Sequence, residues 1–279
     1  MSLAHFHLTG PRAAGALLFF VLLASAVPAD GQETAADTPR SHPASFPHLL
    51  VVDLRDVLGA PLSWRSPQWE RFSLAVAGVG AVALADRWVR DAEARDHNRL
   101  VGQVTHHFES LGSGAAFGIL GTFYVVGLVG HDEKSRNVGE DGVIASVIAG
   151  GIITPVLKYA VGRERPRDTA KTFDFKPFGG SSSFPSGHAT EAFAVASVIA
   201  SDYDSGWVKG AAYGSAVLVA FARVHHQAHF ASDVTAGALI GSSVGRAVVH
   251  RNRDERARYA LAPIAGPHGE PGMAVVFGF

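Results

Sequence analysis

The sequence has no cysteine and little charge, and each shortage limits what the chain can be. Without cysteine, none of its 279 residues can form a disulfide bond, although an exported protein can do without disulfides. Charged residues make up only 18%, which is lean for a soluble protein, yet a mean hydropathy of +0.16 is too low for a pure membrane bundle. The net charge of −1 gives no reason to expect nucleic acid as a partner.

The first 29 residues have the pattern of an export signal. Arg12 precedes an apolar run at 13–24, and small residues follow at 24–29, where a signal peptidase would cleave. The run is short for a membrane-spanning helix, which needs about 20 apolar residues, so a cleaved signal is favoured over a retained anchor. Residues 30–67 read as a linker with a short amphipathic segment. We therefore expect an exported protein on the periplasmic side, either associated with the inner membrane or soluble.

Apolar segments beyond residue 67 predict an all-α fold, a bundle of about six helices over residues 68–252 with the active site at one end. Their length and lack of strict alternation favour helices over strands, and their small residues allow close helix packing. They span about 68–92, 112–130, 142–161, 187–203, 206–223 and 232–250. Pro155 predicts a kink in the third segment. The tail, 253–279, is expected to be a β-hairpin or irregular, with strands at Tyr259–Ile264 and Met273–Phe279.

Three short clusters place cations and imidazoles at the ends of these segments. They are Lys158 with Arg165-Pro166, then Pro185-Ser186-Gly187-His188, then Arg223 with His229 and Asp233. In an up-and-down bundle, the end of the third segment, the start of the fourth, the end of the fifth and the start of the sixth lie on one side. The clusters should therefore converge, and three cations with two histidines would make a site for a phosphate-sized dianion.

The third cluster contains a candidate nucleophile. His229 and Asp233 are four residues apart, so on a helix they share a face. A carboxylate that accepts the proton of one imidazole nitrogen leaves the other nitrogen with a lone pair to attack phosphorus. Arg223 could hold the non-bridging phosphate oxygens with its fork of N–H donors.

The other two clusters supply an anion site and a proton donor. Ser186 is a plausible N-cap for a helix that opens at Gly187, and the free N–H groups of such an end favour anions. His188 could protonate the leaving oxygen. Pro166 is expected to end the preceding helix near Lys158 and Arg165. Because phosphoryl transfer needs mainly positioning and charge neutralisation, we expect no metal and no cofactor.

The strings Lys158-x6-Arg165-Pro166, Pro185-Ser186-Gly187-His188 and Arg223-x5-His229-x3-Asp233 resemble the three-part signature of the type 2 phosphatidic acid phosphatases. That superfamily also holds bacterial class A acid phosphatases and vanadium haloperoxidases, and the resemblance covers about residues 110–250. It implies that His229 is the nucleophile, that Asp233 orients it, and that His188 is the general acid. It implies phosphate binding by Lys158, Arg165, Arg223, the Ser186 hydroxyl and the Gly187 amide.

The chain departs from the family pattern at Ala222, where a serine usually precedes the arginine. Losing that hydroxyl removes one phosphate hydrogen bond, a change of about 1 kcal/mol that should leave activity intact. A rival interpretation is a metal site, because His225, His229 and Asp233 follow at four-residue steps. A metal explains neither the excess of cations nor the second cluster. Arg163 and Arg167 are interpreted as ordinary helix-terminal cations, and His225 and His226 as solvated helix-end residues.

The function these patterns favour is a metal-independent phosphatase acting on a phosphomonoester or pyrophosphate through a phosphohistidine. A lipid phosphate and a membrane setting are preferred over a soluble, broad-specificity periplasmic acid phosphatase. Segment 112–130 is long enough to span a bilayer, whereas the first segment has a short apolar core and Glu191, Lys209 and Arg246 interrupt later ones. A vanadium-dependent haloperoxidase, a metal-dependent hydrolase and a non-enzymatic anion-binding protein remain alternatives.

Overall fold

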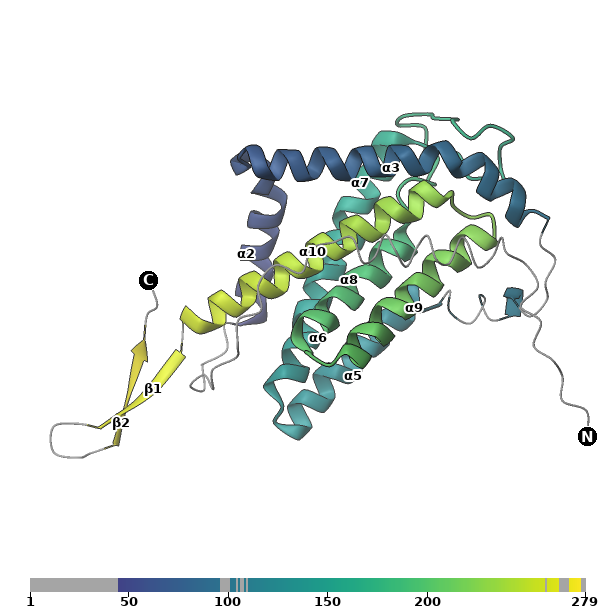
Figure 1. The fold of residues 1–279 in the computed structure, drawn as a ribbon. Coiled ribbons are helices and arrows are strands. Elements are labelled where there is room, and N and C mark those ends of the chain that lie inside the picture. Colours follow the sequence, from purple (N-terminus) through teal and green to yellow (C-terminus); the bar gives the residue numbers. More distant parts are fainter. Residues whose placement is uncertain are drawn as a thin grey trace, which may run out of the picture.

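The fold is a helical bundle, as the sequence predicts (Figure 1). The structure is a computed structural model that describes residues 45–95, 101–103, 105, 108, 110–258, 260–265 and 271–276. The expected export signal at 1–29 and the linker up to residue 44 lie outside the described residues. The amphipathic segment of the predicted linker is helix α2 (Phe46–Gly59), which is followed by a short 3-10 turn, η1 (Ala60–Ser63).

Each predicted apolar segment corresponds to a helix. These helices are α3 (Ser66–Glu93), α5 (Gly114–Gly130), α6 (Glu133–Ser146) with its continuation, α8 (Gly187–Asp202), α9 (Gly206–His225) and α10 (Ala231–Arg258). The 3-10 turn η2 (Ser110–Gly112) precedes α5. Helix α10 extends beyond the predicted bundle boundary at residue 252. Its last turns are held to α6, because Asn252 and Arg256 donate hydrogen bonds to Asp141.

The third predicted segment is one continuous helix from Glu133 to Val161 with a π-helical stretch in its middle. That stretch, η3 (Val147–Ile153), leads directly into α7 (Thr154–Val161). Pro155 cannot donate a backbone hydrogen bond, and the N–H of Thr154 reaches back to the carbonyl of Ala149. The irregularity expected at Pro155 is therefore a wider helical turn just before the proline.

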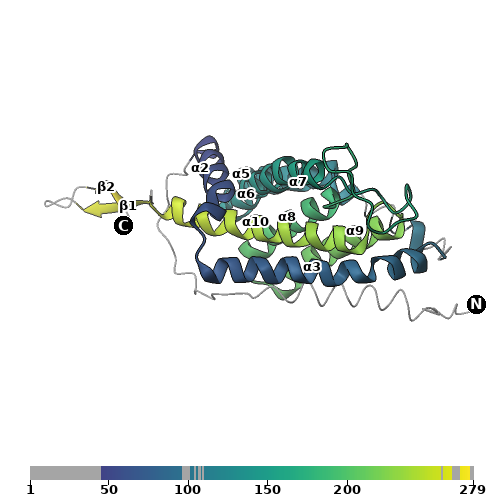
Figure 2. The same cartoon turned by 90° about the horizontal axis from the view of Figure 1, so that it is seen from above.

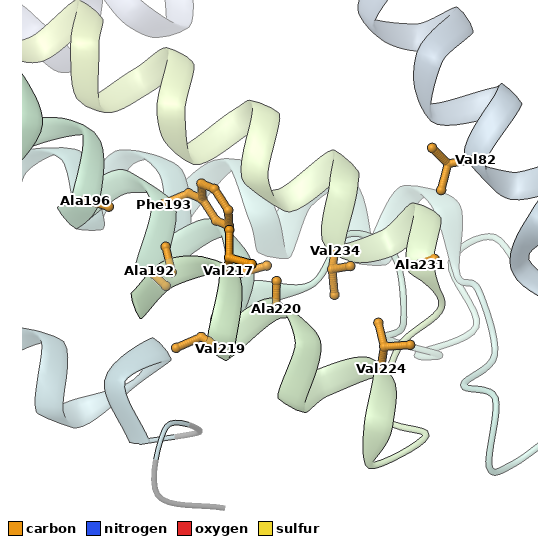
Figure 3. Close-up of a cluster of buried hydrophobic side chains, with 12 residues drawn as sticks. Val82, Ala192, Phe193, Ala196, Val217, Val219, Ala220, Val224, Ala231 and Val234 are labelled. Carbon is orange, nitrogen blue, oxygen red and sulfur yellow. The ribbon is translucent and has the colours of Figure 1, made fainter. Parts of the chain in front are cut away.

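Helix α8 is the centre of the bundle because it is apolar nearly all round. Figure 3 shows Phe193 and its alanine neighbours facing side chains of α9 and α10, with Val82 contributed by α3. The approach of α10 to α8 depends on a stripe of glycines. A Cβ at Gly237 would lie 2.6 Å from the Ser186 carbonyl oxygen, and one at Gly241 would lie 2.2 Å from that of Thr190. This close contact fixes the start of α8 against the first turns of α10.

Helix α3 runs beside α10 along the outside of the bundle (Figure 2), and its side chain Asp86 is fully buried there. At the other end of α10 the chain continues into strands β1 (Ala260–Ala265) and β2 (Pro271–Val276). They pair antiparallel, with Ala262 opposite Ala274, where the sequence suggests a hairpin. In both views the hairpin projects away from the bundle.

Candidate active site

The structure brings the three clusters together at one end of the bundle. Lys158 lies in the last turn of α7, and Gly187 opens α8. A Cβ on Gly187 would lie 3.9 Å from Cε of Lys158, so the first and second clusters are in contact range. The N–H of Ser186 donates to the carbonyl of Asp233 at 3.0 Å, which joins the second cluster to the third. Arg223 completes the group from the last turn of α9.

The turn after α7 is made by Gly162, and the predicted role of Pro166 as the helix stop is wrong. The helix ends at Val161, and Gly162 adopts φ 58°, a left-handed conformation that favours glycine. A Cβ at Gly162 would lie 1.9 Å from the carbonyl oxygen of Lys176, so no larger residue fits. The chain has therefore left the helix before it reaches Pro166, and Arg165 projects from a loop.

Lys158 and Arg165 are held by the same loop residue, Ser182. The Lys158 ammonium donates to the Ser182 carbonyl, and Nη2 of Arg165 donates to the Ser182 hydroxyl at 3.1 Å. Beside them opens a polar groove of about 490 Å³. Its lining residues are Glu164, Arg165, Asp168, Gly179, Gly180, Ser181 and Ser182. Arg165 is therefore reached from solvent through this groove.

His229 is buried, and a single hydrogen bond settles which of its nitrogens can act. Its Nδ1 lies 2.7 Å from the carbonyl oxygen of Ser183. Because a carbonyl can only accept, Nδ1 carries the proton and Nε2 keeps the lone pair. Burial, then the charges of Lys158, Arg223 and Arg165, lower the pKa of His229 well below its ordinary value. The imidazole is therefore neutral at pH 7, as a nucleophile must be.

Asp233 does not bond His229 directly, contrary to the geometry expected from their spacing. Its Oδ2 lies 3.9 Å from Nδ1 of His229 and instead accepts from the Ser183 hydroxyl at 2.6 Å and the Phe230 N–H at 2.9 Å. The physical reason is competition, because the Nδ1–H of His229 already donates to the Ser183 carbonyl. Asp233 is therefore linked to His229 indirectly, through Ser183, whose hydroxyl bonds the carboxylate and whose carbonyl bonds the ring.

Helix α8 begins with the N-cap that the sequence predicts. The Ser186 hydroxyl accepts from the Ala189 N–H at 3.4 Å, which confirms the N-cap, and it retains its own hydrogen to donate. Burial and the charges of Lys158 and Arg165 lower the pKa of His188. Those cations are the expected phosphate ligands, so a bound dianion would offset their effect on His188.

The third cluster is held to the end of α9 by its backbone. The Arg223 carbonyl accepts from the N–H groups of Ala228 and His229 at 3.1 and 3.2 Å, so the arginine and the histidine are fixed relative to each other. Arg223 is 7% exposed, and Ala222, which replaces the usual serine, is fully buried beside it. A guanidinium held in so dry a place pairs strongly with an anion.

Sequence reasoning missed the role of Arg163, which it interpreted as an ordinary helix-terminal cation. The side chain is 2% exposed and forms ion pairs with Asp86 at 2.9 Å and Asp233 at 2.7 Å. It also missed Ser183, whose carbonyl holds His229. No local pattern marks either residue, because their partners are distant in sequence or are backbone atoms.

The structure does not bring together the residues of the alternative metal site. His225 is turned to α3, where its Nδ1 lies 2.9 Å from Glu93, and its side chain is only 8% exposed. It is therefore neither part of a cluster with His229 and Asp233 nor the solvated residue expected. Nor is His226 merely solvated, since its Nε2 lies 3.0 Å from the Thr105 hydroxyl. Among the described residues, no three His, Asp or Glu side chains form a group that could hold a metal ion.

Comparison with known proteins places the motifs in a family context. Residues 142–257 match the model of the PAP2 superfamily. A lipid A 1-phosphatase of Porphyromonas gingivalis is 32% identical over 121 residues, which cover 42% of this chain and 25% of the relative. Lipid A 1-phosphatases of Rhizobium johnstonii and Rhizobium etli are 34% and 32% identical over 105 and 139 residues. These matches cover 35% and 46% of this chain, and 41% and 55% of the relatives.

Two solved structures are also similar in shape. LpxE of Aquifex aeolicus aligns with a TM-score of 0.45 and 25% identity, over 59% of this chain and 92% of that one. The transmembrane PAP2-type phosphatidylglycerolphosphate phosphatase of Bacillus subtilis aligns with a TM-score of 0.49 and 20% identity, over 87% and 96%. The chain spans a quarter to about half of the length of the curated relatives it matches. The three motifs gathered at the helix ends all lie within the segment 142–257, which is similar to the PAP2 superfamily.

Proposed function

We propose that the protein is a metal-independent phosphatase that removes phosphate from a lipid phosphomonoester or pyrophosphate through a phosphohistidine. The observation that carries this is the Nδ1 hydrogen bond of His229 to a carbonyl, because it leaves a neutral imidazole with its lone pair on Nε2. That nitrogen lies in a site whose cations, Lys158, Arg165 and Arg223, are close enough to lower its pKa. A neutral nucleophile beside three cations is suited to attack a dianion.

In the first step Nε2 of His229 forms a bond to phosphorus while the bond from phosphorus to the leaving oxygen breaks. His188 gives its proton to that oxygen, so the alcohol or phosphate leaves neutralised. The three cations and the N–H of Gly187 bind the non-bridging oxygens, where charge is spread in the transition state. In the second step a water molecule attacks phosphorus and returns a proton to His188, and the bond to Nε2 breaks.

Phosphorylated His229 carries a positive charge, and its surroundings suit that form. The proton stays on Nδ1 and remains hydrogen-bonded to the Ser183 carbonyl throughout, so the ring need not move. The carboxylate of Asp233, at 3.9 Å from Nδ1, stabilises the cationic ring. The same environment therefore supports both the neutral nucleophile and the charged intermediate.

A lipid substrate is supported by the outer surface of the helices. Helix α3 and the continuous helix Glu133–Val161 are long and apolar enough to cross a bilayer, and only 17% and 33% of their most apolar windows are buried. Leu84 of α3 and Val129 of α5 are 82% and 76% exposed. The sequence prediction favoured α5 over α3 as a spanning helix, whereas α3 is one of the two helices long enough and α5 is a shorter apolar helix. All three curated relatives described above are named for a lipid substrate.

The test is a panel of phosphates assayed with the detergent-purified protein, in EDTA and without added metal. We expect release of phosphate from lipid A, phosphatidic acid, phosphatidylglycerolphosphate or a polyprenyl pyrophosphate, in preference to a soluble monoester. His229→Ala should abolish turnover, whereas His250→Ala, an exposed histidine on α10, should not. Loss of activity in EDTA would indicate a metal-dependent hydrolase. Preference for the soluble ester would indicate an acid phosphatase, and halogenation that needs vanadate and peroxide a haloperoxidase.

A further inference from the structure

Arg163 lies between the motif residues Lys158 and Arg165, yet both Nη atoms of its guanidinium donate to protein oxygens. One Nη donates to the Ser232 hydroxyl and to Asp233 Oδ1, both at 2.7 Å. The other donates to Asp86 Oδ2 at 2.9 Å and to the Thr172 carbonyl at 2.7 Å. Only the planar fork of an arginine can reach all of these oxygens at once, so its function is to hold this group of residues together.

Asp86 brings helix α3 into this group from outside the family segment 142–257. It is fully buried, and its Oδ1 accepts the backbone N–H of Ser232 at 2.9 Å. The Ser232 hydroxyl accepts a hydrogen bond from Arg163 and donates one to Asp86 Oδ2. The first turn of α10 is therefore fastened to α3 by side-chain and backbone bonds.

A chain of bonds continues from Arg163 to the imidazole of His229 through Ser183. The Ser183 N–H donates to the Arg163 carbonyl at 2.9 Å, and its hydroxyl donates to Asp233, the carboxylate that Arg163 holds. Its carbonyl accepts from His229. All three polar groups of Ser183 are thus used, and its position sets that of the imidazole. The ring of Phe230 covers Arg163 at 4.0 Å and excludes water.

We propose that Asp86 and Arg163 are positioning residues for the reaction at His229 and that they act through Asp233 and Ser183. This inference rests on the proposed function. Two carboxylates and one guanidinium leave a buried group with one net negative charge on the Nδ1 side of the ring. That charge favours the cationic imidazole formed during transfer, and the bonds hold Nε2 in line for attack. Neutralising Asp86 would leave the group with no net charge.

The experiment uses the full-length protein and the substitution Asp86→Asn, which keeps the shape of the side chain. We expect kcat to fall about 10- to 100-fold, the range seen when an outer partner of a functional imidazole is removed. The inhibition constant of tungstate should stay unchanged, since the phosphate ligands are intact. The acid limb of kcat/KM should move to lower pH, because less negative charge faces the imidazolium. The control Asp91→Asn, whose ion pairs are with Arg87 and Arg90 of the same helix, should behave as wild type.

A second variant keeps the proposal testable if Asp86→Asn does not fold. Ser183→Ala removes only the hydroxyl that joins Ser183 to Asp233, and it should show the same lower kcat and unchanged tungstate inhibition. Because this variant removes no charge, the shift of the acid limb to lower pH should be confined to Asp86→Asn. Together with Asp86→Asn, its effect on kcat should be less than additive. Wild-type kcat in either folded single variant, or full additivity, would overturn the proposal. A wild-type protein with no turnover of any phosphate ester would refute the proposed function instead.

Discussion

Binding of an anion in the site should cause His188 to become protonated. In the empty site burial, Lys158 and Arg165 hold the pKa of His188 below its ordinary 6.5, so the imidazole is neutral at pH 7. A dianion at about 4 Å contributes roughly 4 kcal/mol per unit charge at an effective dielectric constant of about 20. Since one pKa unit corresponds to about 1.4 kcal/mol, that is enough to raise the pKa above 7. Binding should therefore take up close to one proton at pH 7.

The assay is titration calorimetry with tungstate, a dianion that does not itself titrate near neutral pH. Measured in buffers of different ionisation enthalpy, the apparent binding enthalpy should vary with the buffer by about one proton per site. The uptake should decline at alkaline pH, where His188 stays neutral even in the complex. It should also decline below the pKa of His188 in the empty site, where the imidazole is already protonated before tungstate binds. His188→Asn should abolish it. If uptake persists in that variant, the proton goes to His229 and the assignment of acid and nucleophile is wrong.

Three other predictions follow from the geometry of the bundle and the site. Gly241→Ala should lower the free energy of unfolding by about 1–3 kcal/mol, because its Cβ would meet the Thr190 carbonyl. Gly80→Ala should raise the free energy of unfolding by up to about 1 kcal/mol, because a Cβ there has nothing within 4 Å. Chemical denaturation measures both. Because the folded-state pKa of His229 is depressed, the neutral imidazole contributes fully to stability above pH 6.5, and this contribution is lost as the pH falls. Melting curves at decreasing pH should show the loss of stability, and the loss should be smaller in His229→Asn. Ala222→Ser should strengthen phosphate inhibition about fivefold, the equivalent of about 1 kcal/mol, and an unchanged inhibition constant would show that the serine of the family pattern contributes no bond here.

Most of the fold could be predicted because its helices carry local signals. The apolar segments and the serine N-cap at residue 186 depend on near neighbours in sequence, and the structure has helices at those places. The convergence of the three clusters followed from alternating helix directions. The end of α7 was misjudged, because Gly162 is recognisable only once Lys176 is known to lie against it.

The inner structure of the site could not be predicted, for a different reason. Arg163 is paired with Asp86, 77 positions away, and no periodicity connects the two residues. The acceptor of the His229 proton is a backbone carbonyl, which every residue possesses and no sequence letter marks. The spacing of His229 and Asp233 predicted one shared helix face, but α10 begins at Ala231, so His229 lies in the loop before it. The two side chains are nevertheless close, at 3.9 Å, and the spacing could not show that Ser183 links them.

The central claim is that His229 carries the phosphoryl group during turnover. Rapid acid-free quenching with ³²P-labelled lipid substrate, followed by mass spectrometry of the peptide that contains residue 229, tests it directly. The account predicts phosphate on His229 that is stable in base and lost in acid, and no label in His229→Ala. Turnover by the wild-type protein without any phosphorylated intermediate, or with the phosphate on another residue, would contradict it.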